Sequence, residues 1–254
     1  MASPADAAAS WPSRPPVADE VARRLLREGE PELLGRMPWS SNATFLVCLT
    51  LPGEAGQLLA VYKPRQGERP LWDFPAGTLC QREVAAGVVS DVLGWEIVPD
   101  TILRDGPLGP GMVQRFVDHD PEQHYFTLLP DHADDFRRFA AFDVVLNNTD
   151  RKGGHCVRDP FGHVWGVDHG IAFHVHWKLR TVIWEFAGEP LAPPISSDLE
   201  RFLGALDGEG GAALAELLSP AELIAVQRRT EDLLGAGHLP EPDDGYHSMP
   251  WPLV

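Results

Sequence analysis

Strand-like segments dominate the first 118 residues of this 254-residue chain, and helical patterns dominate the rest. The runs FLVCLTL, QLLAVYKP and GMVQRFV join β-branched and apolar residues between turn residues, which is typical of strands in an antiparallel sheet. From residue 134 onward, apolar residues recur mainly at helical spacing. Strands followed by helices favour an α+β fold with a β-rich N-lobe and a helix-rich C-lobe.

One helix is expected inside the β-rich part. Thr78 followed by Gln81 resembles a capping box, and Val84, Val88 and Val92 continue at helical spacing. This places Glu83 in the first turns of that helix. Near the other end of the chain, Ser219 and Pro220 are a favourable N-cap and first residue for a last helix.

These patterns divide the chain into four parts. We expect a disordered leader rich in Ala, Ser and Pro over 1–18 and an N-lobe over 19–118. A C-lobe over 119–240 and an irregular tail over 241–254 follow.

Composition limits the classes of partner and the cellular compartment that we expect for this protein. The formal net charge of −16 opposes binding to nucleic acid and to anionic lipid surfaces. No run approaches the roughly 18 apolar residues of a membrane helix, and the start of the chain lacks the pattern of a signal peptide. The three cysteines contain no CxxC pair, which fits a reducing compartment. We therefore predict a cytoplasmic protein with no nucleic-acid partner and no stable membrane insertion.

Four charged residues follow one another in a suggestive order. Lys63 ends a strand, Glu83 lies on the next helix, Asp150 opens a polar loop after a helix, and Asp168 follows a strand. Phosphoryl transfer from a nucleotide requires such parts: a lysine on the phosphates, a carboxylate that fixes it, an aspartate at the acceptor hydroxyl and another at the metal. Each residue alone has a plainer interpretation as a strand edge, a helix surface or a turn. The order of all four carries the prediction.

The loop sequences resemble a known superfamily. NNTDRKGGH, followed by VDHGIAF, resembles the catalytic and metal-binding loops of the phosphatidylinositol 3-/4-kinase superfamily, especially the type II phosphatidylinositol 4-kinases and short actinobacterial members. The resemblance covers roughly residues 30–190 and extends to the related HipA-type kinases. It implies a two-lobed, protein-kinase-like fold.

The resemblance also implies which residues bind ATP. Lys63 would contact the nucleotide phosphates and Glu83 would pair with it. A turn ending at Asn42 would replace a glycine-rich loop, and the strand over 112–117 would lead into the hinge beside adenine. The remaining nucleotide contacts implied in these two segments are Ser40, Ser41, Phe116 and Val117.

Catalysis and metal binding are assigned in the same way. Asp150 would be the catalytic aspartate, Arg151 would structure its loop, and Arg151 and Lys152 would offset phosphate charge. Asp168 would be the main ligand of Mg²⁺ or Mn²⁺. His155 stands where the superfamily has an asparagine as second ligand, and imidazole suits softer ions than Mg²⁺.

Residues around these loops have simpler interpretations. We expect Asp143, on the helix before Asp150, to brace the loop by hydrogen bonding. His169, His174 and His176 lack acidic partners at metal-ligand spacing and are interpreted as structural.

The expected function is transfer of the γ-phosphate of ATP to a hydroxyl of a protein, the chain itself included, or of an inositol-like or lipid acceptor. The acidic composition favours a soluble acceptor. Two alternatives stay open: transfer of AMP to protein, and a nucleotide-binding pseudokinase scaffold, which His155 and the missing glycine-rich loop would favour.

Overall fold

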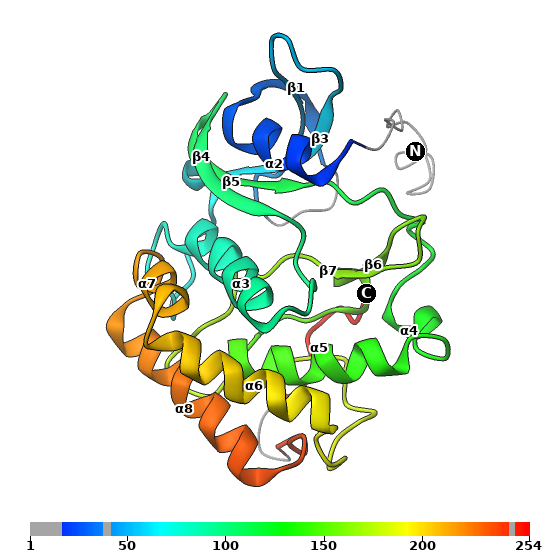
Figure 1. The fold of residues 1–254 in the computed structure, drawn as a ribbon, viewed down its shortest axis with the longest axis vertical. Coiled ribbons are helices and arrows are strands. Elements are labelled where there is room, and N and C mark those ends of the chain that lie inside the picture. Colours follow the sequence, from blue (N-terminus) through cyan, green and yellow to red (C-terminus); the bar gives the residue numbers. More distant parts are fainter. Residues whose placement is uncertain (1–16, 38–41, 244–246) are drawn as a thin grey trace.

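The computed structural model describes residues 17–37, 42–243 and 247–254. Most of the predicted leader, and the predicted nucleotide contacts Ser40 and Ser41, lie outside these ranges. Within them, an antiparallel sheet of five strands forms the upper part of Figure 1, with helices below it. Its order is β1 (Glu30–Arg36), β2 (Phe45–Thr50), β3 (Leu58–Pro64), β5 (Gly109–Arg115) and β4 (Thr101–Gly106).

Alternation along β3 decides which way Lys63 faces. Ala60 and Tyr62 point to the face covered by helix α2 (Asp19–Glu28), where they join its Leu25 and Leu26 in one apolar cluster. Successive strand residues face opposite sides. Lys63 therefore leaves the sheet on the other face, toward the helical half.

Helix α3 (Leu79–Leu93) forms where the sequence predicts, but its start is built differently. The hydroxyl of Thr78 donates to the carbonyl of Pro75 at 2.7 Å instead of capping the helix. The carboxylate of Glu68 accepts from the amides of Leu79 and Cys80, at 3.2 and 2.9 Å. The capping-box prediction is wrong because a charged acceptor from another segment occupies the positive end of the helix.

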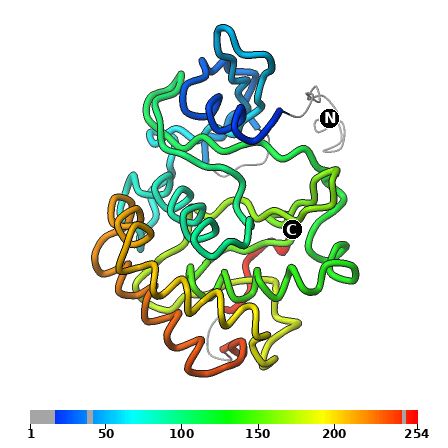
Figure 2. Tube along the Cα trace, viewed as in Figure 1, coloured from blue at the N-terminus to red at the C-terminus, as the bar shows by residue number. Residues whose placement is uncertain are grey.

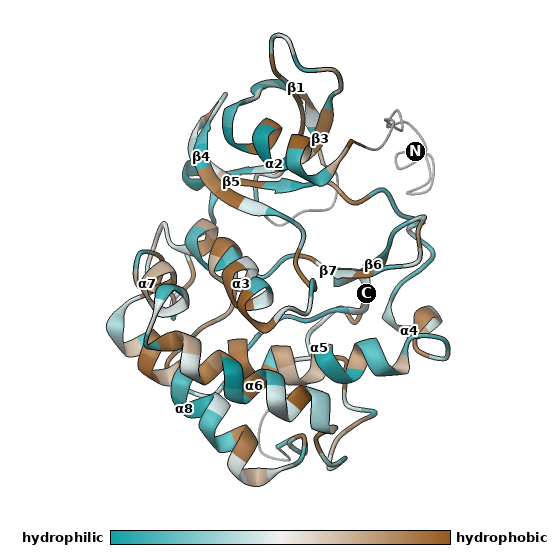
Figure 3. Ribbon diagram, in the orientation of Figure 1, coloured by the Kyte–Doolittle hydropathy of each residue, from teal (hydrophilic) through white to brown (hydrophobic). Residues whose placement is uncertain are grey.

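The helical half is built from five helices and a short hairpin around the larger apolar cluster of the described residues. Its helices are α4 (Tyr125–Leu128), α5 (Ala133–Leu146), α6 (Pro193–Leu206), α7 (Glu209–Ala215) and α8 (Pro220–Ala236), and its hairpin joins β6 (Cys156–Arg158) to β7 (Val164–Gly166). Figure 3 shows apolar and polar stretches alternating along α6 and α8, as expected for helices with one face in a core. Ser219 caps α8 as predicted, and Pro220 is its first residue.

The larger cluster also includes α3, through residues such as Ala85, Val89 and Leu93. This helix packs against β4 and β5 on one side and against α6 and α7 on the other. It therefore joins the sheet to the helical half. In the described part of the chain, no helix is both long and apolar enough to span a membrane.

Candidate active site

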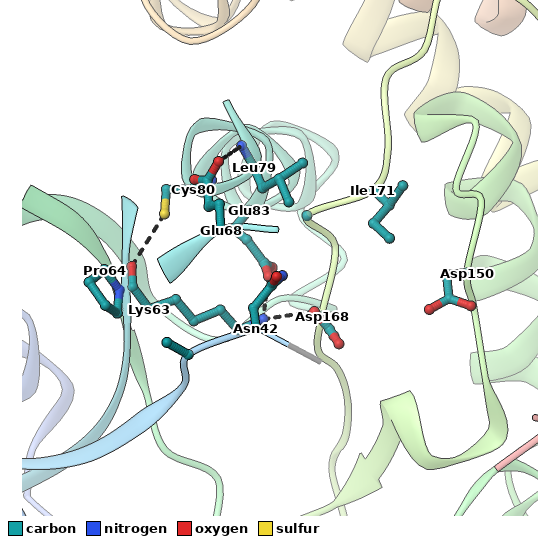
Figure 4. Close-up of a pocket in the computed structure, with 12 residues that line it drawn as sticks. Asn42, Lys63, Pro64, Glu68, Leu79, Cys80, Glu83, Asp150, Asp168 and Ile171 are labelled. Atoms are coloured by element: carbon teal, nitrogen blue, oxygen red, sulfur yellow. Dashed lines mark hydrogen bonds and ion pairs between the residues drawn. The ribbon is translucent and has the colours of Figure 1, made fainter. Parts of the chain in front are cut away.

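Lys63 is the meeting point of three segments (Figure 4). Its Nζ lies 2.5 Å from Oε1 of Glu83 on α3 and 2.7 Å from Oδ1 of Asp168, which follows β7. The other oxygen of Glu83 accepts the amide of His169 at 2.7 Å. Strand β3, helix α3 and the 168–172 loop are thus joined through charged groups.

The three charged groups of this cluster differ in how the structure shifts their pKa values. Burial opposes the charge of Lys63, but Asp168 and Glu83 outweigh burial and raise the pKa of the ammonium. The Lys63 charge in turn holds the pKa of Asp168 well below its usual range. For Glu83, which is 1% exposed, burial dominates and its pKa is raised despite Lys63. Of the two carboxylates, Asp168 therefore stays ionised to a lower pH than Glu83 does.

The backbone of Asp168 is left-handed, with φ 61°. This conformation is unfavourable for most residues other than glycine, although Asp and Asn tolerate it. Asn147, at the end of α5, has a similar φ of 52°. Strained residues that persist cluster at functional sites. The 147–155 loop therefore begins with a left-handed residue, Asn147, and the 168–172 loop begins with another, Asp168.

Much of the polar content of the 147–155 loop fixes the loop itself. Asn147 Nδ2 donates to the carbonyls of His174 and His176, at 2.9 and 2.7 Å. Asn148 Nδ2 donates to Oδ1 of Asp143 at 3.0 Å, and the amide of Thr149 donates to the carbonyl of Ile171. Asp150 is thereby held between helix α5 and the segment after Asp168.

A buried ion pair supports this loop from below. Asp143 and Arg151 are both fully buried, with Nη2 of Arg151 2.9 Å from Oδ1 of Asp143. The same Nη2 lies 2.6 Å from Nε2 of His169. The prediction that Asp143 braces the loop is confirmed. The contacts of Arg151 fit its expected part in structuring the loop; its guanidinium is buried against Asp143 and lines neither cavity, and its expected effect on phosphate charge stays a prediction.

Asp150 faces the pocket across from Lys63 (Figure 4). Its Oδ2 lies 3.1 Å from Nζ of Lys152. Burial raises the pKa of Asp150, and the cations of Lys152 and Arg180 partly offset this. A carboxylate with a raised pKa is better suited to accept a proton than an ordinary surface carboxylate.

His155 lies beside Asp168, with Nε2 3.6 Å from Oδ2. Burial lowers the pKa of His155 to about 4, so its imidazole is neutral near neutral pH and can offer a lone pair. Among the described residues, no group of three or more His, Cys, Asp or Glu could hold a metal ion. A cation bound by Asp168 and His155 would need further oxygen ligands, such as phosphate or water.

A pocket of about 320 Å³ opens beside this cluster. Lys63, His155 and Asp168 supply its polar end. The rest of its lining mixes polar residues with apolar ones, and the apolar ones are Met37, Val61, Phe116, Val117, Val157 and Val167. Such a volume, with a few convergent polar groups, is typical of a small-molecule site. The amide of Phe116 already donates to the carbonyl of Leu59, so this residue offers its ring rather than its N–H.

The structure brings most of the predicted site residues together. Two cavities share Asn42, Lys63 and Asp168, and Asp150 lines one of them. Sequence reasoning missed Glu68, Gln114, Val157 and Val167, which also line these cavities. Val157 lies in β6 and Val167 directly follows β7, so the apolar residues of these two short strand segments were the available signal.

A solved structure has a similar fold. The proinflammatory kinase CtkA of Helicobacter pylori superposes with a TM-score of 0.51 at 11% identity, over 84% of this chain and 93% of CtkA. HipA of Shewanella oneidensis MR-1, solved with HipB and operator DNA, overlaps at a TM-score of 0.40 and 11% identity, over 94% of this chain and 73% of HipA. The CtkA likeness confirms the predicted α+β, two-lobed, protein-kinase-like fold.

Sequence comparison gives a nearer relative. No family model matches the chain. Protein Rv2133c of Mycobacterium tuberculosis is 43% identical over 263 aligned positions, which cover 90% of this chain and 94% of the relative. Identity at this level over nearly the whole of both chains shows common descent, and this chain belongs to the family of Protein Rv2133c.

Proposed function

We propose that this protein is an ATP-dependent phosphotransferase related to the phosphatidylinositol 3-/4-kinase superfamily. It would move the γ-phosphate to a hydroxyl of a protein, itself included, or of an inositol-like or lipid acceptor. The observation that carries the proposal is the position of Lys63 between Glu83 and Asp168, at a pocket that Asp150 also lines. The kinase-like fold shared with CtkA supports it.

The residues that line this site are suited to bind a nucleotide. In this proposal residues 19–118 form the nucleotide-binding lobe and 119–240 the catalytic lobe. The apolar side chains of the 320 Å³ pocket, with Val61, Phe116 and Val117 among them, would receive adenine. Lys63, held by Glu83, would receive the phosphates, with Asn42 nearby. Ammonium and backbone donors placed in advance are the main contribution a protein makes to phosphoryl transfer.

Asp168 and the neutral His155 would hold a divalent cation. When bound, Mg²⁺ or Mn²⁺ would neutralise charge on the phosphate oxygens. A carboxylate is an ordinary ligand for either ion, whereas imidazole suits Mn²⁺ better. The donor set is therefore compatible with both metals.

Asp150 would orient the acceptor hydroxyl and accept its proton. Its raised pKa and its place across the pocket from Lys63 suit that role. Lys152, 3.1 Å from Asp150, would stabilise the carboxylate and the charge that develops on the transferred group. Positioning of these groups, rather than covalent catalysis by the protein, would supply most of the rate.

One observation favours a second candidate, a nucleotide-binding scaffold without turnover: His155 in place of the expected asparagine. An acceptor panel separates the two. The purified protein is incubated with γ-labelled ATP and Mg²⁺ or Mn²⁺, alone and with lysate proteins, free inositols or phosphatidylinositol vesicles. Label on any acceptor supports the phosphotransferase and names its acceptor class. Nucleotide binding with no labelled product in any arm overturns it and supports the scaffold.

A further inference from the structure

Arg82, the residue before Glu83, makes contacts that an ordinary helix arginine lacks. Its side chain is 2% exposed. Nη1 donates to the carbonyl of Ala172 at 2.6 Å, and Nη2 pairs with Glu222 of α8. The ring of Phe74 lies 4.8 Å from the guanidinium carbon. The guanidinium therefore joins α3, the 168–172 loop and the start of the last helix.

Glu222 is itself fixed by contacts other than its ion pair with Arg82. Its Oε2 accepts from the amide and the hydroxyl of Ser219, at 2.9 and 2.7 Å, in the capping box of α8. Its Oε1 receives Arg82. A capping-box glutamate is normally a local feature of a helix end. Here one of its oxygens serves the cap and the other holds a residue 140 positions earlier in the chain.

Neighbouring residues of α3 reach the same loop from two directions. Glu83 accepts the amide of His169, and Arg82 donates to the carbonyl of Ala172. Consecutive residues on an α-helix are about 100° apart around the axis. Because Arg82 and Glu83 are adjacent on one helix, a shift of α3 that moves Glu83 away from Lys63 would also displace Arg82.

From this geometry we propose that Arg82 and Glu222 are positioning residues, by which α8 holds α3 and the 168–172 loop so that Glu83 stays on Lys63. The catalytic consequence of this inference rests on the proposed function. The link that Arg82 makes between α3, the 168–172 loop and α8, called the tie below, does not depend on that function. A buried ion pair is weak evidence for a stabilising role, because desolvation offsets much of its attraction. The pair lies between α3 and α8, and this place instead fits a role in positioning α3.

A double-mutant cycle tests whether the pair acts through Glu83. Glu222→Gln, Glu83→Gln and the double variant are compared in kcat/KM for phosphotransfer. We expect Glu222→Gln to lower kcat/KM about tenfold in the wild type, because small misplacements are costly at such sites. In the Glu83→Gln background it should cost less than about twofold. Equal losses in both backgrounds would assign the pair a merely structural role and overturn the proposal.

Backbone hydrogen exchange, measured without nucleotide, tests the tie independently of activity. Glu222→Gln should speed exchange in α3 and at the His169 amide. The matched control is Glu189→Gln, which breaks the 2.7 Å pair of Arg137 and Glu189 away from α3. It should leave both segments unchanged. If Glu222→Gln does not fold, Arg82→Lys, which keeps the charge but loses the planar fork, replaces it in both arms.

The two arms separate this inference from the proposed function. Absence of phosphotransfer in the wild type would contradict the function, while exchange would still decide the tie. Unchanged exchange in α3 and at His169 would overturn the tie whatever the activity.

Discussion

Nζ of Lys63 lies 2.7 Å from Oδ1 of Asp168, although the two residues are 105 positions apart in the chain. Lys63 thus links the sheet to the loop that follows β7, and Asp168 carries the more persistent negative charge of its two partners. In the proposed function, this lysine would receive the phosphates of the nucleotide, and Asp168 would receive the metal ion. The predictions below follow from this arrangement.

The first prediction concerns Asp168. ATP with Mg²⁺ should raise the melting temperature, because a ligand at 100 times its Kd stabilises a protein by about 2.7 kcal/mol. Asp168→Ala should abolish the part of this shift that depends on the metal and leave a smaller one with ATP alone. Thermal unfolding with and without chelator measures both. An unchanged metal-dependent shift in the variant would remove Asp168 from the metal site.

The second prediction concerns Asp150, which lines the cavity that contains Glu83 and not the 320 Å³ pocket with Phe116 and Val117. Asp150→Asn should reduce kcat by about 10²-fold or more, the usual contribution of a general base. The Kd for ATP should change by less than about threefold, as expected of a residue that acts in the transition state. Steady-state kinetics and titration calorimetry give the two numbers. Parallel losses in both would indicate that the 147–155 loop has collapsed.

The third prediction concerns His155. Because imidazole suits Mn²⁺ better than Mg²⁺, wild-type activity with Mn²⁺ should equal or exceed that with Mg²⁺. His155→Asn should shift the preference toward Mg²⁺, and His155→Ala should weaken activity with both. Rates measured across both metals check this. Identical metal profiles for the wild type and His155→Ala would leave Asp168 alone as the protein ligand.

The fourth prediction concerns stability and pH. Burial raises the pKa of Glu222, but Ser219 and Arg82 outweigh it, so the folded-state pKa lies below the unfolded value. The stabilisation from Glu222 is therefore present above the unfolded pKa of about 4.3 and is lost as pH falls through the folded pKa. Glu222→Gln should cost about 1–3 kcal/mol at pH 7, in the range of hydrogen bonds to charged groups.

Denaturant unfolding from pH 7 to pH 3 measures this difference. The gap between wild type and Glu222→Gln should narrow below about pH 4. A gap that stays constant to pH 3 would mean that the Glu222 charge contributes nothing.

The fifth prediction concerns the segment at 252–254. The carbonyl of Leu253 accepts the amide of Gly153 at 2.7 Å, so this segment lies against the 147–155 loop, as Figure 2 shows in red beside green. Removing 252–254 should speed hydrogen exchange at residues 153–155 and lower kcat more than ATP affinity. Trp251→Ala is the control, since Trp251 is 87% exposed. Equal exchange in the truncated and control proteins would contradict the prediction.

Local features of the fold were predictable from sequence because their signals are local. Apolar spacing located α3, α5 and α8, and turn residues bounded β2 and β3. Strand β4 was missed because its charged residues Arg104 and Asp105 obscure the pattern, and pairing with β5 defines it. The lysine, glutamate and two aspartates were recognised because each lies in, or soon after, a recognisable strand or helix.

The remaining features depend on contacts between distant residues. The cap of α3 comes from Glu68, eleven positions before Leu79, and no local motif indicates it. The ion pair that holds Arg151 in the interior joins it to Asp143, and no local motif indicates that its guanidinium is buried. The pair of Arg82 and Glu222 is visible only once the fold brings the start of α8 within side-chain reach of α3. The cytoplasmic location and the lack of a nucleic-acid partner stay predictions from composition.

The most direct test of the central claim follows the two ends of ATP separately. Wild-type protein and Asp150→Asn are incubated with γ-labelled or α-labelled ATP, at matched nucleotide occupancy, and the acceptor found in the panel is isolated. The account predicts γ-label on the acceptor for the wild type, at least about 10²-fold less for Asp150→Asn, and no α-label for either. Label from the α-phosphate, or equal γ-labelling by both proteins, would contradict it.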